Sequence, residues 1–226
     1  FYSSMVGFGE SFFSAFAVFL KATNFQLGIL GSLPQTVGSI SQLFSNRLIR
    51  YFNSRKRFVC ASVFLEALMY IPIALVYFLG TMRVWHLILF LCMYWTLGMI
   101  VSPAWSSWMG DLVPEKERGK YFGNRNRIAG LVWFATLLIG GYILQHYSHG
   151  MRNGYIGFAI IFMIASISRV MSFVYLSKKF EPEYKQVPEA DFTFIDFLKQ
   201  ARYRNYGRFV LFLCSMNFAV YIAGPF

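Results

Sequence analysis

The chain has 226 residues, of which 57% are hydrophobic and only 14% are charged, whereas about 25% of the residues in a typical soluble domain are charged. A water-soluble protein of this size could not bury so much apolar surface in one core, so the composition excludes an ordinary soluble domain. The net charge of +11 comes from basic residues that gather in clusters between long apolar stretches. The composition therefore predicts an integral membrane protein.

Seven apolar stretches are long enough to cross a bilayer as helices, because about 20 apolar residues span a hydrocarbon core of roughly 30 Å. These predicted spans 1 to 7 cover residues 1–20, 26–44, 58–79, 84–109, 128–147, 154–176 and 209–226. The stretches do not alternate between apolar and polar residues, and lipid offers no partner to an unpaired backbone amide, so helices are expected rather than strands. The predicted fold is all-α, with a six-helix transmembrane bundle over residues 1–177, a cytoplasmic linker over 178–207 and a seventh transmembrane helix over 208–226.

Basic residues are divided unequally between the segments that connect the spans. Segments 2–3, 4–5 and 6–7 together hold 17 lysines and arginines, whereas the other connections hold only 3, namely Lys21, Arg83 and Arg152. Lys and Arg favour the cytoplasmic side of a membrane, so segments 2–3, 4–5 and 6–7 are predicted to be cytoplasmic. This asymmetry accounts for the basic pI without a nucleic-acid partner, although a basic phosphate-binding face is the alternative reading of such clusters.

No residue pattern indicates catalysis or a bound metal. Cys60, Cys92 and Cys214 lie singly, and His146 and His149 have no third ligand nearby in the sequence. No nucleophile motif, phosphate-binding loop or paired acid site is found. We therefore expect a protein that is not an enzyme and has no cofactor and no metal site.

Two cytoplasmic segments carry motifs of a known family. "SNRLIRYFNSRKRF", residues 45–58, stands where that family keeps a Gly-x-x-x-Asp-Arg-x-Gly-Arg-Lys loop, and its Ser-Arg-Lys end, which contains Arg55 and Lys56, matches well. "GDLVPEKERGKYFG", residues 110–123, is similar to the 4–5 loop of many bacterial members, with Asp111 closing span 4 and Arg118-Gly preceding span 5. With six spans, a long charged segment and a seventh span, the chain resembles the major facilitator superfamily of secondary transporters.

The resemblance implies a permease that moves a small solute by alternating access, with H⁺ as the candidate coupling ion. The chain would be the N-terminal half, plus the start of span 7, of a twelve-helix protein whose C-terminal bundle is part of the same chain. It would lie in the plasma membrane, the bacterial inner membrane, with lipid and solute as partners. Arg55, Lys56, Asp111 and Arg118 are then candidates for gating at the cytoplasmic loops. The alternative is a non-transporting polytopic membrane protein, such as a receptor, scaffold or assembly factor, on the same fold.

Two further segments have distinctive patterns. Span 2 is rich in small and polar residues, including Gln35, which suits close helix packing or a wet cavity better than lipid. In the 6–7 segment, Thr193 and Asp196 have the spacing of a capping box and predict a short amphipathic helix on the cytoplasmic face. A disordered tether is the alternative for this segment.

Glu10 is the ionisable residue that sequence position places closest to the membrane midplane. It lies eleven residues before Lys21, which corresponds to roughly 16 Å along a helix. Transporters hold substrates and coupling ions near the midplane. Glu10 is therefore a candidate for binding a cationic substrate or carrying a proton, and a hydrogen bond within the helix packing is the alternative. The further substrate or coupling candidates are Gln35, Tyr94, Trp95, Asn217 and Tyr221.

Glu66 and Arg169 are the other ionisable residues within predicted spans. Each lies nine residues from a basic residue at the cytoplasmic end of its span, which places both at roughly 13 Å depth. An unpaired charge there costs about 2.5–3.5 kcal/mol on insertion scales. Equal depth and opposite sign predict a structural ion pair, with a transport role as the alternative.

Overall fold

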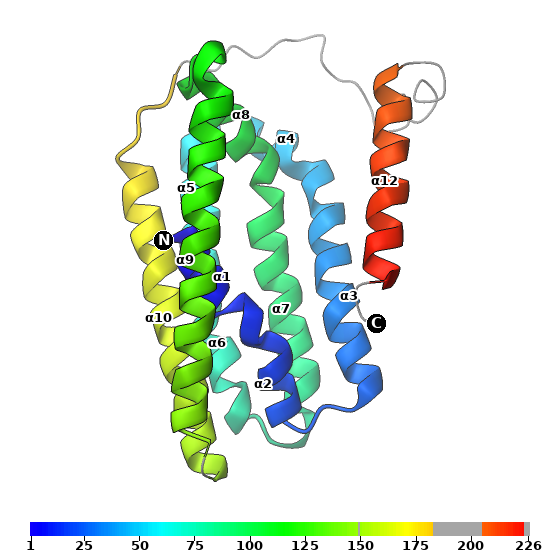
Figure 1. The fold of residues 1–226 in the computed structure, drawn as a ribbon, viewed down its shortest axis with the longest axis vertical. Helices are drawn as coiled ribbons and strands as arrows, with labels where there is room; N and C mark the ends of the chain where they lie inside the picture. The colour runs from blue at the N-terminus through cyan, green and yellow to red at the C-terminus, as the bar shows by residue number, and fades with distance from the viewer. Residues whose placement is uncertain (149, 183–204, 224–226) are drawn as a thin grey trace. The chain divides into compact units, whose positions relative to one another are not determined.

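The computed structural model describes residues 1–148, 150–182 and 205–223, and all the regular structure in these ranges is helical. The chain divides into two compact units, Phe1–Glu183 and Tyr184–Phe226. The described part of the second unit is helix α12, Asn205–Ala223 (Figure 1). The amphipathic helix predicted around Thr193 and Asp196 lies outside the described residues.

The first unit is built from ten α-helices and five short 3₁₀ turns in its described residues. The α-helices are α1 Tyr2–Phe8, α2 Phe13–Phe19, α3 Asn24–Ser41, α4 Ser45–Phe52, α5 Arg55–Leu68, α6 Tyr70–Leu75, α7 Arg83–Ile100, α8 Ser102–Leu112, α9 Arg118–His146 and α10 Met151–Ser177. The 3₁₀ turns are η1 Glu10–Phe12, η2 Gln42–Phe44, η3 Val76–Phe78, η4 Gly80–Met82 and η5 Glu115–Glu117.

Four helical segments of the described residues are long and apolar enough to cross a membrane. They are Arg55–Phe78, Gly80–Leu112, Glu115–His146 and Met151–Ser177, which correspond to predicted spans 3 to 6. Predicted spans 1, 2 and 7 are not among them. Span 1 is interrupted by η1, and small and polar residues dilute the apolar character of α3. The all-helical membrane class is thus confirmed, and the count of six plus one spans stays a prediction.

Prolines divide two of these segments. A proline has no N–H to donate and its ring clashes with the carbonyl four residues earlier. Pro72 lies four residues after Leu68, where α5 ends, and Pro103 lies four residues after Met99, at the end of α7. Predicted spans 3 and 4 are therefore each built from two consecutive α-helices rather than one.

Helix α9 begins ten residues before the predicted start of span 5. The polar sequence from Arg118 to Arg127 continues as helix, so the connection between spans 4 and 5 shortens to residues 113–117. Hydropathy marks the part of a helix that matches the hydrocarbon, whereas a helix can extend beyond it wherever its side chains reach water. The boundary predicted at residue 128 was wrong for the helix for this reason.

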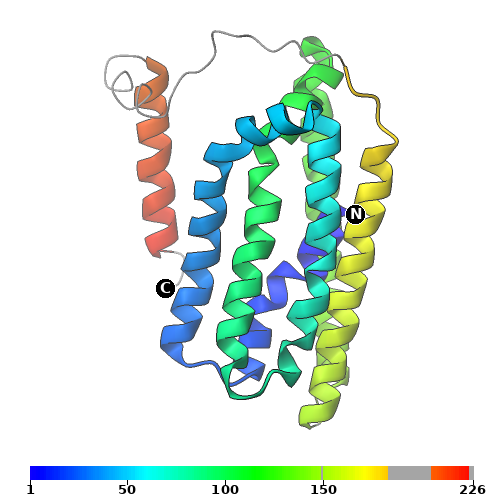
Figure 2. The same cartoon turned by 180° about the vertical axis from the view of Figure 1, so that it is seen from behind.

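The helices of the first unit pack in pairs (Figures 1 and 2). Helix α3 packs along α7, α1 packs on α9 and α10, and α10 packs along α5. At Gly38 of α3, an added Cβ would lie 2.8 Å from the carbonyl oxygen of Trp95, so the absent side chain permits the close approach to α7. Gly28 and Gly31 face open space instead. An aromatic core, which includes Phe13, Phe16 and Phe162, fills the centre of the unit.

Candidate functional site

Glu10 lies where the first helix breaks. α1 ends at Phe8, Gly9 has φ −109° and ψ −76°, and Glu10 begins the 3₁₀ turn η1 before α2 starts at Phe13. A Cβ at Gly9 would collide with the ring of Tyr70, so glycine lets the broken helix lie against α6. Figure 1 shows α1 and α2 offset from each other at this break. The break presents the Glu10 carboxylate to the neighbouring helix α7.

The partner of Glu10 is the phenol of Tyr94 on α7. Tyr94 Oη donates to Glu10 Oε1 over 2.7 Å, and it also lies 3.2 Å from Tyr70 Oη. Both phenols contact the sulfur of Met5, at 2.8 Å for Tyr94 and 3.0 Å for Tyr70. Tyr94 and Tyr70 are only 1% and 2% exposed. We call Met5, Glu10, Tyr70 and Tyr94 the Glu10 cluster.

Glu66 on α5 and Arg169 on α10 meet in the interior of the unit. Arg169 Nη2 and Nε lie 2.5 Å and 3.1 Å from the same oxygen, Glu66 Oε2. An added Cβ at Gly98 of α7 would lie 3.1 Å from Glu66 Oε1, so a glycine makes room for the carboxylate. The guanidinium also lies over the ring of Tyr2, with Cζ 5.0 Å from the ring centroid. The two buried charges neutralise each other, which offsets part of the cost of their desolvation.

The candidate gating residues gather where α5 begins and α8 ends. Arg55 Nη1 donates to Asp111 Oδ2 over 2.6 Å and to Ser107 Oγ over 2.9 Å. Arg118 Nη2 donates to the carbonyl of Gly110 over 2.8 Å, next to Asp111 in the chain. Lys56 takes part through its backbone, which donates to Glu181 Oε1 over 3.0 Å.

The other substrate or coupling candidates are Gln35, Trp95, Asn217 and Tyr221. Among the described residues, no hydrogen bond joins any of their side chains to the Glu10 cluster. Trp95 makes an edge-on ring contact with Tyr94, at 5.9 Å between centroids. The side chain of Gln35 is exposed on α3. Asn217 and Tyr221 belong to α12, and their side chains lie outside the described residues.

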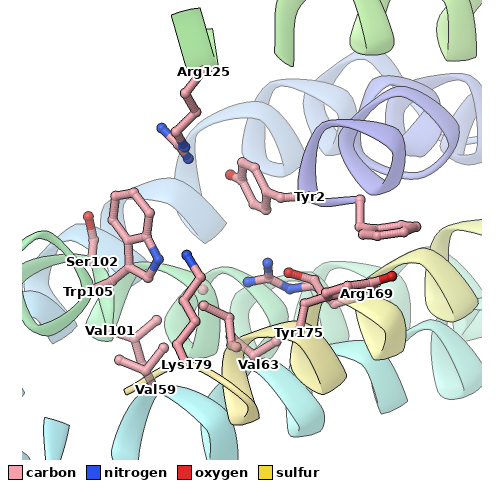
Figure 3. Close-up of a pocket in the computed structure, with 14 residues that line it drawn as sticks. Tyr2, Val59, Val63, Val101, Ser102, Trp105, Arg125, Arg169, Tyr175 and Lys179 are labelled. Carbon is pink, nitrogen blue, oxygen red and sulfur yellow. The ribbon is translucent and has the colours of Figure 1, made fainter. Parts of the chain in front are cut away.

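A cavity of about 380 Å³ lies next to the Glu66–Arg169 pair. Three cations line it, Arg125 from α9, Arg169 from α10 and Lys179 just after α10, and in Figure 3 their nitrogen ends point toward the same space. Aromatic side chains, including Tyr2 and Trp105, form much of the rest of its wall. None of the described residues that line it is acidic.

The cavity escaped prediction from the sequence because it is assembled from five separate parts of the chain. In the sequence, Arg125 and Lys179 belong to the 17 basic residues that predict the cytoplasmic side, and Tyr2 and Trp105 lie within predicted spans 1 and 4. One signal in the sequence could have pointed to Arg125 as a residue near the membrane interior. It lies only three residues before the apolar run that begins at Ile128, and the structure places both in helix α9.

The Glu10 cluster and the cavity are joined through one face of α7. Tyr94 and Gly98 are four residues apart in the helix and therefore lie on adjacent turns of the same face. Gly98 lies against Glu66, and both Gly98 and Arg169 line the cavity. A continuous set of contacts thus runs from Glu10 through Tyr94 and Gly98 to the Glu66–Arg169 pair and the cavity.

Comparison with known proteins settles the family of this chain. Residues 1–226, the whole chain, match the family model of the Major Facilitator Superfamily. The chain belongs to the Major Facilitator Superfamily. Neither curated proteins nor solved structures give a significant match. Membership of this superfamily, whose members are typically transporters rather than enzymes, and the four long apolar helices indicate a multi-pass membrane transporter for small solutes.

Within this superfamily member, the arrangement can do two kinds of chemistry. The Glu10 cluster offers a carboxyl group that can gain or lose a proton beside a phenol that can donate to it. The cavity offers cationic donors beside aromatic faces. The first is suited to proton exchange and the second to recognition of a solute.

Proposed function

We propose that the protein is a secondary active transporter, a permease that moves a small solute across the membrane by alternating access and uses protons as the coupling ion. The observation that carries this proposal is the carboxylate of Glu10, placed at a helix break within an apolar stretch and held by the buried phenol of Tyr94 at 2.7 Å. Ionisable groups within membrane segments are costly and are typical of ion pathways and proton relays.

The position of Glu10 suggests how a proton could be coupled to movement. An ionised Glu10 accepts a charge-assisted hydrogen bond from Tyr94, which is stronger than the bond that a neutral carboxyl would accept. Protonation therefore weakens the attachment of η1 to α7. Because η1 separates two helices of seven residues each, a change of this attachment can alter the angle between α1 and α2. The proton would in this way bias the equilibrium between two arrangements of the first span.

The substitution Glu10→Gln tests the proposal. Glutamine keeps the shape and can still accept a hydrogen bond from Tyr94, but it cannot cycle a proton. In full-length protein reconstituted into vesicles and offered a panel of labelled small solutes, we expect loss of gradient-driven accumulation while exchange of solute down its own gradient continues. Glu117→Gln, an exposed acid at the start of α9, is the matched control and should behave as wild type.

The other outcomes each have a definite meaning. Loss of both accumulation and exchange would assign Glu10 to direct binding of the solute. Unchanged accumulation would reduce Glu10 to a packing residue and reject proton coupling at this site. Failure of the wild-type protein to move any solute of the panel would favour the alternative, a receptor, scaffold or assembly factor on the same fold.

A further inference from the structure

The cavity beside the Glu66–Arg169 pair has an excess of positive charge. Arg125, Arg169 and Lys179 line it, and none of its described lining residues carries a carboxylate. Glu66 is not one of the lining residues, and its Oε2 pairs with the guanidinium of Arg169 and neutralises that charge. Two positive charges, those of Arg125 and Lys179, therefore face the cavity without a carboxylate within 4.0 Å among the described residues.

The present contacts of these two cations are weak ones. Arg125 lies over the ring of Trp105, with Cζ 4.6 Å from the centroid, and its Nη1 donates to Asn126 Oδ1 over 3.2 Å. Lys179 Nζ lies 3.5 Å from the thioether sulfur of Met109, which is a weak acceptor. Cations in such surroundings bind an anion more strongly than cations in bulk water do, because the local dielectric constant is lower. The electrostatic character of the cavity thus favours a negatively charged occupant.

The rest of the wall determines what the anion can carry. Tyr2 and Trp105 present aromatic rings to the space between the cations, and Val59 and Val63 add an apolar surface from α5 (Figure 3). The volume of about 380 Å³ falls within the roughly 300–1,000 Å³ of ligand pockets in proteins, which combine an apolar lining with a few placed polar groups. A bare inorganic ion would leave most of this surface without a contact.

We propose that this cavity binds an organic anion, a small molecule with a carboxylate or phosphate group and an apolar or aromatic body. Arg125 and Lys179 hold the anionic oxygens, and Trp105 and Tyr2 flank the body. Arg169 engages Glu66 through Nε and Nη2 and keeps further N–H groups of its guanidinium for the cavity. The inference rests on the proposed transport function, since it assigns the class of the transported solute. It places solute recognition at the cations of the cavity, whereas proton exchange stays at Glu10.

The test uses phenyl phosphate as the probe, because it combines a phosphate group with an aromatic body. Its binding to the full-length protein in detergent is measured by the ligand-dependent shift of the unfolding temperature, which requires no transport. We expect the dissociation constant to rise by at least about tenfold in Arg125→Gln and in Lys179→Gln, because each removes a charge-assisted contact. The matched controls are Arg127→Gln and Lys178→Gln, exposed neighbours that do not line this cavity and should bind as wild type does.

Two comparison probes examine the two parts of the ligand. Benzyl alcohol, which keeps the ring without the charge, should bind much more weakly than phenyl phosphate. Inorganic phosphate should also bind more weakly, because it makes no contact with Trp105 and Tyr2. Equal affinity for phenyl phosphate and benzyl alcohol, or an affinity that Arg125→Gln and Lys179→Gln leave unchanged, would overturn the proposal.

A lipid headgroup offers the same phosphate chemistry as a solute does, and a separate arm distinguishes these sources. The same variants are assayed in micelles with added phosphatidylglycerol. If phosphatidylglycerol displaces phenyl phosphate and alone shows the dependence on Arg125 and Lys179, the cavity is a lipid site and the assignment to a solute fails. Phenyl phosphate that binds in lipid-free detergent and resists displacement supports it. Because binding is measured without a gradient, failure here leaves proton-coupled transport untouched, and failure of transport leaves the binding result untouched.

Discussion

At the scale of single residues, Tyr94 combines several buried contacts of its hydroxyl group with packing of its ring. Its hydroxyl group donates to Glu10 at 2.7 Å while it lies within hydrogen-bonding distance of Tyr70 Oη and contacts the sulfur of Met5. Its ring packs edge-on against Phe13, with 5.4 Å between centroids. One residue of α7 thus fixes the carboxylate at the helix break and also belongs to the aromatic core.

The substitution Tyr94→Phe separates these two roles, and Tyr70→Phe is its matched control. Both tyrosines are buried and both contact Met5, but the hydroxyl that donates to Glu10 is that of Tyr94. Tyr94→Phe leaves the partly buried carboxylate of Glu10 without its donor, at a cost of about 1–3 kcal/mol. We expect gradient-driven accumulation to fall strongly in Tyr94→Phe and little in Tyr70→Phe, as measured in reconstituted vesicles. Equal losses in both variants would show that the phenol of Tyr94 serves packing alone.

Glu66 and Arg169 lend themselves to a double-mutant cycle. Glu66→Gln leaves a buried guanidinium without its counter-ion, and breaking a buried pair in this way costs about 3–5 kcal/mol. Arg169→Gln should be similarly destabilising. The double variant is neutral at both positions, so we expect it to recover a large part of the loss in the unfolding temperature measured in detergent. Strictly additive losses would show that the two residues are not energetically coupled.

At the scale of elements, the start of α5 is held by Glu181, which lies four residues after the end of α10. Ser54 caps the helix by accepting from the backbone N–H of Arg57 at 3.0 Å, and its own hydroxyl donates to Glu181 Oε2 over 2.6 Å. The other oxygen of Glu181 accepts from the backbone of Lys56 at 3.0 Å. A carboxylate at a helix N-terminus satisfies unpaired N–H groups and interacts favourably with the helix dipole. The segment that follows α10 is thereby fastened to α5.

Replacement of Glu181 by alanine should loosen this fastening locally. We expect a loss of about 1 kcal/mol, typical of a removed cap, and faster amide hydrogen exchange in the first turn of α5, residues 55–58. Exchange measured by mass spectrometry reports on that turn directly. Glu117→Ala is the control, because Glu117 makes no side-chain cap bond at the start of α9. An unchanged exchange rate at the start of α5 in Glu181→Ala would contradict the proposed role of the carboxylate.

The elements differ in how far the sequence could predict them. Helices α5 to α10 follow from long apolar stretches, because a bilayer-length apolar run has few other solutions in lipid. The break at Glu10 could not be located in the same way, since glycines in membrane helices serve packing as well as bending. Only the ring of Tyr70, which occupies the space where a Cβ of Gly9 would lie, shows what this glycine permits. The start of α9 was misplaced because polarity marks the end of the hydrocarbon and not the end of the helix.

At the scale of the whole molecule, the family could be predicted from the sequence, whereas the candidate site could be predicted only in part. Glu66 and Arg169 can be proposed as a pair from depth and sign alone, and the structure brings them within hydrogen-bonding distance. Their structural role stays a prediction that the double variant tests. The partner of Glu10 depends on how α7 lies against η1, and the cavity depends on how residues of α1, α5, α7, α8, α9 and α10 come together. No local pattern contains that information. These two features could not be predicted because they are set by contacts between residues far apart in the sequence, and residue type alone does not reveal such contacts.

The orientation of the molecule in the membrane is the last prediction, and it rests on the 17 basic residues of three connecting segments against 3 in the others. Glu115 and Asn153 are exposed residues that flank α9, which spans 118–146 between them. Single cysteines at these positions, in a protein whose Cys60, Cys92 and Cys214 are replaced by serine, would differ in which side of the membrane they face.

An impermeant thiol reagent applied to intact cells should label the cysteine at position 153 and leave the cysteine at position 115 unreacted. Permeabilised cells provide the control, because both cysteines should then react. The reverse pattern would overturn the orientation and would place the cavity lined by Arg125 and Lys179 at the outer end of the bundle. The positive charge of that cavity would then meet its anion from outside the cell rather than from the cytoplasm, so the labelling result also fixes the side from which phenyl phosphate should inhibit transport.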